Sequence, residues 1–131
     1  MSYGLAVALQ EAVFARLAQV PELARVAVVD ALPNGMAGTF VLIGGEEVID
    51  RSDQTGRGAE HRFVVSVVSD ATGFQSAKML GVAISDALAD APLVLNRGRL
   101  VGLWFQRAVA RRLDEGRVRR IDLTFRARVE E

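Results

Sequence analysis

The predicted strand at 117–129 alternates strictly between polar and apolar side chains from Arg120 onward, and this pattern restricts the possible folds more than any other feature of the chain. Successive side chains of a strand point to opposite faces, so a period of two predicts a β-strand. One face, expected to lie on a core, consists of Ile121, Leu123, Phe125, Ala127 and Val129. The other face, expected in water or against a partner, consists of Arg120, Asp122, Thr124, Arg126 and Arg128.

Four further strands are expected. Residues 99–110 form a second long strand, and the tight turn Asp114-Glu115-Gly116 joins it to the strand at 117–129 as a hairpin. Residues 61–69 are apolar on both sets of alternating positions, which predicts a strand covered on both faces. Shorter strands are expected at 26–29 and 39–44, with turn-forming residues between them at 31–38.

Apolar residues at helical spacing predict helices over 4–19 and 73–91. Asp70 or Thr72 is expected to cap the start of the second helix, and Pro92 to end it. The order is therefore α-β-β-β-α-β-β. We expect a single domain over 1–131 with an α+β fold of two layers, in which two helices pack on one face of a mainly antiparallel sheet. The inward stripe of the second helix is expected to include Phe74, Ala77, Leu80 or Gly81, Ile84, Leu88 and Ala91.

Residues 45–60 are the least core-like part of the chain. Only two large apolar residues, Val48 and Ile49, occur among acidic, basic and small ones. The segment is either a long loop or a polar extension of a hairpin, and loops of this length are often functional. Its charged residues are the acids Glu46, Glu47, Asp50, Asp53 and Glu60 and the bases Arg51 and Arg57.

The composition excludes several classes of enzyme. The chain has 131 residues, no Cys and one His, which excludes thiol nucleophiles, Cys-zinc sites, iron–sulfur clusters and most zinc-protease arrangements. No stretch is long and apolar enough to span a membrane, and no basic region precedes the apolar first residues, as it would in an export signal. A soluble protein of a reducing cytoplasm is expected.

The remaining candidates for chemistry are weak. His61 accompanies no nucleophile motif, so a structural or exposed histidine is favoured over a catalytic base. Gly56-Arg57-Gly58 precedes a strand and not a helix, which disfavours a phosphate-binding loop. The acids of 45–60 do not follow the calcium-loop spacing, so a solvated acidic segment is favoured over a cation site. We expect no catalytic residues, no cofactor, no bound metal and no enzyme activity.

Charge is distributed unevenly along the chain. Residues 1–96 carry 6 bases and 11 acids, a net charge of −5, whereas residues 97–131 carry 10 bases and 5 acids, a net charge of +5. Five arginines surround the tip of the predicted hairpin, namely Arg111, Arg112, Arg117, Arg119 and Arg120. No RNA- or DNA-binding motif accompanies them, so a protein interface or a solvated tip is favoured over nucleic-acid binding.

The order and spacing of several short segments resemble one known family. The first group is DALP at 30–33 with Gly35, FVLIG at 40–44, EHRF at 60–63 and the V-x-S segment at 67–69. The second group is DAPLVL at 90–95, GRLVGLWF at 98–105 and RAR at 126–128. Together they resemble the tail-completion, or tail-terminator, family of long-tailed, siphophage-like phages and of gene transfer agents, over nearly the whole chain.

The resemblance implies a structural protein without a catalytic site. It implies a homo-hexameric ring that caps the tail tube, stops its polymerisation and joins it to the head-side connector or stopper protein, while DNA passes through the lumen without specific recognition. It also implies assembly in the bacterial cytoplasm and a final place at the head–tail junction of a phage-like particle. The alternatives are a neighbouring head-to-tail connector or stopper, and a small nucleic-acid-binding domain.

Closing a ring requires two unlike surfaces on each subunit, because each contact joins one surface to a different one on the next copy. We expect the arginine-rich hairpin of one protomer to approach an acidic surface of the next. The expected interface residues are Glu46, Glu47, Asp50, Arg51, Asp53, Arg57, Arg111, Arg112, Arg117, Arg119 and Arg120.

Overall fold

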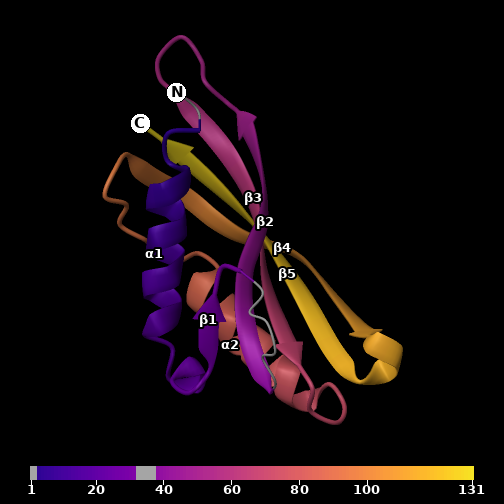
Figure 1. The fold of residues 1–131 in the computed structure, drawn as a ribbon. Coiled ribbons are helices and arrows are strands. Elements are labelled where there is room, and N and C mark those ends of the chain that lie inside the picture. Colours follow the sequence, from indigo (N-terminus) through magenta and orange to yellow (C-terminus); the bar gives the residue numbers. More distant parts are fainter. Residues whose placement is uncertain (1–2, 32–37) are drawn as a thin grey trace.

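The computed structural model describes residues 3–31 and 38–131. Its elements, shown in Figure 1, follow the predicted order α-β-β-β-α-β-β, with two short 3-10 turns at Pro21–Leu23 and Asp114–Gly116. The helices are α1 (Ala6–Ala18) and α2 (Gln75–Leu88). The strands are β1 (Ala27–Val29), β2 (Thr39–Asp50), β3 (Gly58–Ser69), β4 (Arg99–Leu113) and β5 (Val118–Glu130). Most of the turn predicted at 31–38 lies outside the described residues.

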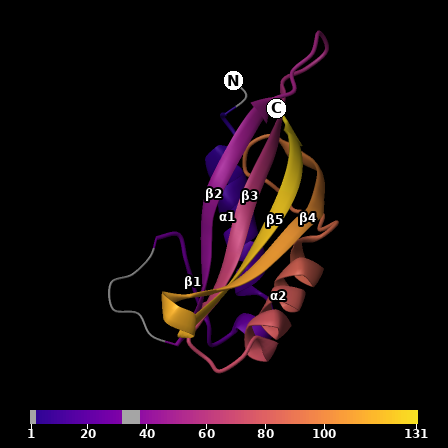
Figure 2. The same cartoon turned by 90° about the vertical axis from the view of Figure 1, so that its right-hand side faces the viewer.

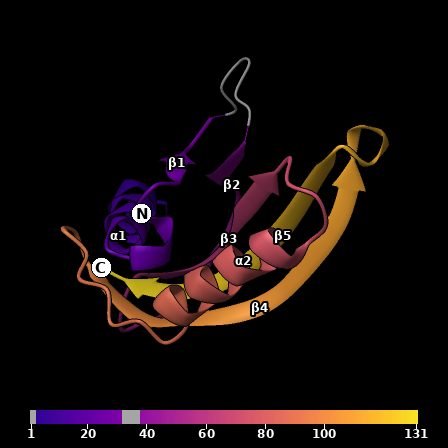
Figure 3. The same cartoon turned by 90° about the horizontal axis from the view of Figure 1, so that it is seen from below.

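One five-stranded sheet organises the domain, with the strand order β1-β2-β3-β5-β4. Neighbouring strands are antiparallel except β1, which pairs in parallel with residues Phe40–Leu42 of β2. The sheet is strongly curved, and Figure 3 shows both helices within its concave side. The predicted α+β fold of two layers, with both helices on one face, is therefore confirmed.

The core lies between the concave face of the sheet and the two helices. Alternate residues of β5, from Ile121 to Val129, are buried there, as the sequence pattern predicted. Phe125 is 0% exposed, and its ring lies 5.7 Å from the ring of Phe63 and 6.0 Å from that of Phe105, measured between centroids. From α2, the buried residues include Ala77, Gly81, Ile84 and Leu88.

The polar segment 45–60 is mostly strand, and of its two predicted forms the hairpin extension is the one observed. β2 continues to Asp50 and β3 begins at Gly58, so the loop between them is only 51–57. The description of this segment as the least core-like part of the chain is wrong for its last residues. Gly58, Ala59 and Glu60 are buried because β5 pairs with β3 along its whole length.

The ends of α2 also differ from the prediction. Neither Asp70 nor Thr72 caps the helix: Phe74 occupies the N-cap position without a side-chain hydrogen bond, and the Asp70 carboxylate accepts the backbone N–H of Gly38 instead. The helix ends at Leu88, before Pro92 is reached. The physical reason is a competing bond, since the backbone N–H of Asp90 donates to the carbonyl of Leu103 in β4 at 2.8 Å.

Candidate functional site

The convex face of the sheet carries a network of charged side chains centred on Glu60. This carboxylate is 6% exposed and contacts two guanidinium groups, that of Arg62 at 2.8 Å and that of Arg126 at 3.3 Å. Arg62 also lies 3.6 Å from Glu47 on β2. The guanidinium of Arg126 stacks over the Trp104 ring of β4, 4.6 Å from its centroid. Four strands are therefore connected through polar side chains on the face away from the helices.

A second network on the same face is centred on Asp122 of β5. The hydroxyl of Ser66 donates to one carboxylate oxygen at 2.6 Å, and Nε of Arg120 donates to that oxygen at 2.8 Å. The other oxygen accepts Arg111 of β4 at 3.0 Å. Two of the five arginines at the hairpin tip, Arg111 and Arg120, are thus paired with Asp122 of their own hairpin.

Both carboxyl groups titrate below their ordinary range. Burial alone would raise the pKa of Glu60, but hydrogen bonds from Arg126 and Arg62, together with their positive charges, outweigh it and lower the pKa from 4.5. Burial likewise opposes ionisation of Asp122, and bonds from Ser66 and Arg120 with the charge of Arg111 lower its pKa from 3.8. The folded protein therefore favours the charged form of both groups.

These shifts predict a loss of stability in acid. A folded-state pKa below the unfolded value gives stability that is present above the unfolded pKa and is lost as the pH falls through the folded one. We expect the free energy of unfolding to fall as the pH drops below about 4.5. Urea denaturation across a pH series should show a flatter acid limb for Glu60→Gln. Glu22→Gln, at an exposed position, should keep the wild-type slope, and equal slopes in all three proteins would contradict the prediction.

The remaining arginines of the hairpin occupy two different places. Arg112 and Arg119 lie opposite each other on β4 and β5, and both guanidinium groups lie within 6.0 Å of the Phe74 ring centroid at the start of α2. Arg119 also donates to the carbonyl of Gly116 at 2.6 Å. Arg117 pairs with Asp114 within the turn, at 3.3 Å. The five arginines that sequence reasoning treated as one cluster are therefore divided between the two faces of the sheet and the turn.

The acidic residues of β2 are divided in the same way. Glu47 lies on the convex face beside Arg62, whereas Glu46 lies on the concave face, where its carboxylate is 3.1 Å from Nδ1 of His61. His61 is 0% exposed, and its Nε2 has no hydrogen-bond partner among the described residues. The histidine is therefore a buried core residue. The Asp50 carboxylate accepts the backbone N–H of Ser52 at the end of β2.

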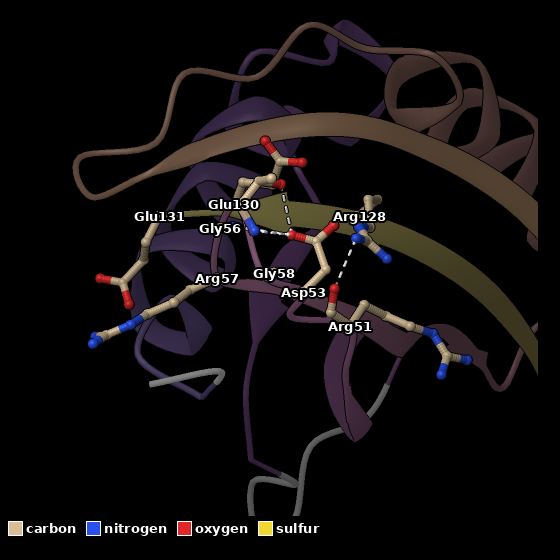
Figure 4. Close-up of a pocket in the computed structure, with 9 residues that line it drawn as sticks. Arg51, Asp53, Gly56, Arg57, Gly58, Arg128, Glu130 and Glu131 are labelled. Carbon is tan, nitrogen blue, oxygen red and sulfur yellow. Dashed lines mark hydrogen bonds between the residues drawn. The ribbon is translucent and has the colours of Figure 1, made fainter.

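The loop between β2 and β3 borders a small polar pocket, shown in Figure 4. Asp53 organises this loop, because its carboxylate accepts the hydroxyl and backbone N–H of Thr55 and the N–H of Gly56. These bonds lower the pKa of Asp53 from 3.8. The side chains of Arg51 and Arg57 point away from the centre of the pocket. The loop therefore satisfies its own acid and does not gather its charges around a common point.

Among residues 3–31 and 38–131, no three His, Cys, Asp or Glu side chains come together in a way that would hold a metal ion. Within the same residues, no helix has the length and apolar character needed to cross a membrane.

The sequence of the chain matches a known protein family. The model of the family described as "Tail completion protein gp17" matches residues 11–130. The chain belongs to this family. The predicted resemblance is thereby confirmed, and family membership makes the protein a structural component of phage-type tails. No curated protein matches the sequence.

A solved structure agrees with the family assignment. A chain in the structure titled "Virion of native gene transfer agent (GTA) particle" is 57% identical to this tail completion protein. The match covers 99% of this chain and 100% of that one, with a TM-score of 0.91. The two chains are therefore similar in sequence as well as in fold, along almost their full lengths.

One surface of this tail completion protein was missed by sequence reasoning. Most of β4 is exposed, including the large apolar side chains Val101, Trp104, Phe105, Val109 and Leu113. The sequence held half of the signal, because β4 has apolar residues at both alternating sets of positions. The other half, the place of β4 at the edge of the sheet, comes from the strand order. An exposed strand of this composition is unusual for an isolated subunit and indicates a contact surface.

Proposed function

We propose that the protein is the tail terminator of a phage-like particle. In this role it forms a hexameric ring at the end of the tail tube, stops the polymerisation of the tube and joins it to a head-side connector. The observation that carries the proposal is the full-length match, at 57% identity, to a chain of a gene transfer agent virion. The family match, which names tail completion, supports the same role.

The surface of the subunit supports assembly into a ring. A cyclic ring joins two unlike surfaces of each copy, and the subunit has two that differ in charge. β4 carries four arginines and no acid, whereas β2 carries three acids and no base. The proposed interface residues remain those of the hairpin and of the acidic segment: Glu46, Glu47, Asp50, Arg51, Asp53, Arg57, Arg111, Arg112, Arg117, Arg119 and Arg120.

Charged pairs are expected to contribute only a small share of the free energy of this assembly. An exposed ion pair contributes only about 0–1 kcal/mol, so charged pairs would select the partner and the register between copies. Several of the arginines are already paired within the subunit, which reduces what they gain from a neighbour. The exposed apolar side chains of β4 are therefore the better source of affinity.

The test is the length of tails assembled without this protein. Particles produced from a deletion of its gene should show tubes of variable and excessive length and heads without tails in negative-stain images. Supplying the intact gene in trans should restore tails of uniform length. Normal tailed particles in the deletion strain would overturn the proposal. Native mass spectrometry of the purified protein, alone and with tube protein, would report the number of copies in the ring.

A further inference from the structure

One edge of the sheet is open along a long segment of β4. From Trp104 to Leu113 every residue is exposed, and β4 is the last strand in the sheet order. An edge strand leaves backbone N–H and C=O groups that can pair with a further strand. Proteins usually protect such edges with proline, short strands or a covering segment. This part of β4 has no proline, and the neighbouring backbone contact, from Asp90 to Leu103, ends just before it.

The opposite edge of the sheet is open as well. Among residues 3–31 and 38–131, β1 pairs with Phe40–Leu42 of β2, and no strand pairs with the following residues, Ile43 to Ile49, on that side. Gly44 and Gly45 are exposed there, and a glycine can expose little besides backbone. Figure 2 shows β2 and β4 on opposite sides of the sheet. Each subunit therefore has two unlike open edges.

The strand directions allow these edges to join. β2 is antiparallel to β3, β3 to β5 and β5 to β4, so β4 runs opposite to β2. In a ring, the next copy is related to the first by rotation about the ring axis, so the β2 strands of neighbouring copies run in the same sense along the ring. The β2 strand of the next copy would therefore meet the β4 of the first copy as an antiparallel pair, and the alternation would continue through every subunit. Two β4 edges could form an antiparallel pair only if one copy were turned end over end, which rotation about the ring axis does not do.

The register follows from what is open on each strand. Residues 109–111 of β4 lie level with the part of β2 that β1 covers, because Val109 and Leu42 share one row of the sheet through Asp122 and Ser66. Trp104 lies level with Glu47, in the open part of β2. The next copy must be displaced along the strands to bring its open half alongside. A sheet that closes into a barrel has strands tilted by about 35–45°, which over four strands amounts to a shift of roughly five residues. That shift brings Val109 close to Glu47 of the next copy.

Charge and apolar surface are complementary at this junction. Arg107 of β4 and Glu47 of β2 both lie on the convex face, so a joined sheet places them on the same side. On the concave face, β4 and α2 form an apolar groove lined by Val82, Phe105 and Ala108 among others. Beside the open edge of β2, α1 presents exposed apolar residues, with Val7 69% exposed next to Glu46.

We propose that neighbouring copies of this protein join edge to edge. The segment Trp104–Leu113 of β4 pairs with Ile43–Ile49 of β2 in the next copy, and the outer side of α1 in that copy covers the apolar groove beside β4. This junction deepens the proposed ring and rests on that function. It makes one continuous antiparallel sheet around the ring, in which main-chain hydrogen bonds give affinity and the diagonal contact between Arg107 and Glu47 fixes the register.

The absence of cysteine in the chain provides a clean test by cross-linking. Glu47→Cys is combined in turn with Trp104→Cys, Arg107→Cys and Val109→Cys, and assembled particles are treated with a mild oxidant or a short bismaleimide. At least one pair should give a ladder of covalent multimers in a denaturing gel. Each single-cysteine variant, and Glu47→Cys combined with Glu22→Cys at an exposed position outside the proposed junction, should remain monomeric in the gel.

The outcomes separate this junction from the ring itself. Particles of normal tail length in which no pair cross-links would overturn the edge-to-edge junction and leave the tail-terminator function intact. Dimers from Val109→Cys alone would show that two β4 edges meet each other, which also overturns it. Particles that assemble normally without the protein would overturn the proposed function and the junction together. As a second readout, Arg107→Glu and Glu47→Arg should each reduce ring formation, and the double variant should restore it.

Discussion

Replacing Phe125 with alanine should lower the free energy of unfolding by about 3–5 kcal/mol. The side chain is 0% exposed and lies at the centre of the sheet, between the rings of Phe63 and Phe105. Truncation removes its apolar burial and leaves a cavity that a rigid, curved sheet fills poorly. Urea denaturation followed by circular dichroism would measure the change as a lower midpoint.

The matched control is Phe14→Ala. Phe14 lies on the outer side of α1 and is 42% exposed, so its loss should change the stability of the isolated subunit much less. If Phe125→Ala unfolds at the wild-type denaturant concentration, the apolar face of β5 does not carry the core. A reduced m-value would indicate instead that the variant no longer unfolds in two states.

Replacing Gly98 with alanine should cost a comparable amount. Gly98 has a φ of +66°, and a Cβ at this position would lie 2.6 Å from the carbonyl oxygen of Glu130 and would also collide with the Leu5 side chain. The left-handed conformation costs an alanine about 1–2 kcal/mol, and forced overpacking costs about 1–3 kcal/mol. We therefore expect a loss of about 2–5 kcal/mol in the free energy of unfolding.

Gly56→Ala is the control for this prediction. Gly56 lies in the loop between β2 and β3, and nothing lies within 4 Å of a Cβ built there. Its substitution should leave the thermal midpoint within the error of the measurement. Equal thermal midpoints for both alanine variants would contradict the prediction. They would mean that the start of β4 moves away from α1 and β5 without a loss in the free energy of unfolding.

Local periodicity predicted much of the fold. The alternation in β5 was correctly assigned because one face is buried and the other is polar, so the two-residue period is plain in the sequence. The helices were found because each buries one stripe. The end of α2 was misplaced because a tertiary hydrogen bond, from Asp90 to Leu103, ends it before the proline that a local rule would use.

The candidate interface was less predictable, since charge counts along the chain do not show which side chains already have partners. Asp122 binds Arg111, Arg120 and Ser66, and this network depends on the alignment of three strands. The buried position of Glu60 likewise requires β5 to lie beside β3. The open edge of β4 follows from the order of strands in the sheet, and the sequence does not state that order.

The bulge in β2 has a consequence for insertions and deletions. Gly44 pairs with Val64 and Glu46 with Phe63, which leaves Gly45 as an extra residue with a φ of +71°. Before the bulge the odd-numbered residues face the helices, and after it the even-numbered ones do. Deletion of Gly45 would leave the rest of the sequence unchanged. Each side chain from 46 to 50 would nevertheless move to the opposite face of the sheet. Val48 would leave the core and Glu47 would enter it, so the loss of one residue here should be as damaging as the replacement of several.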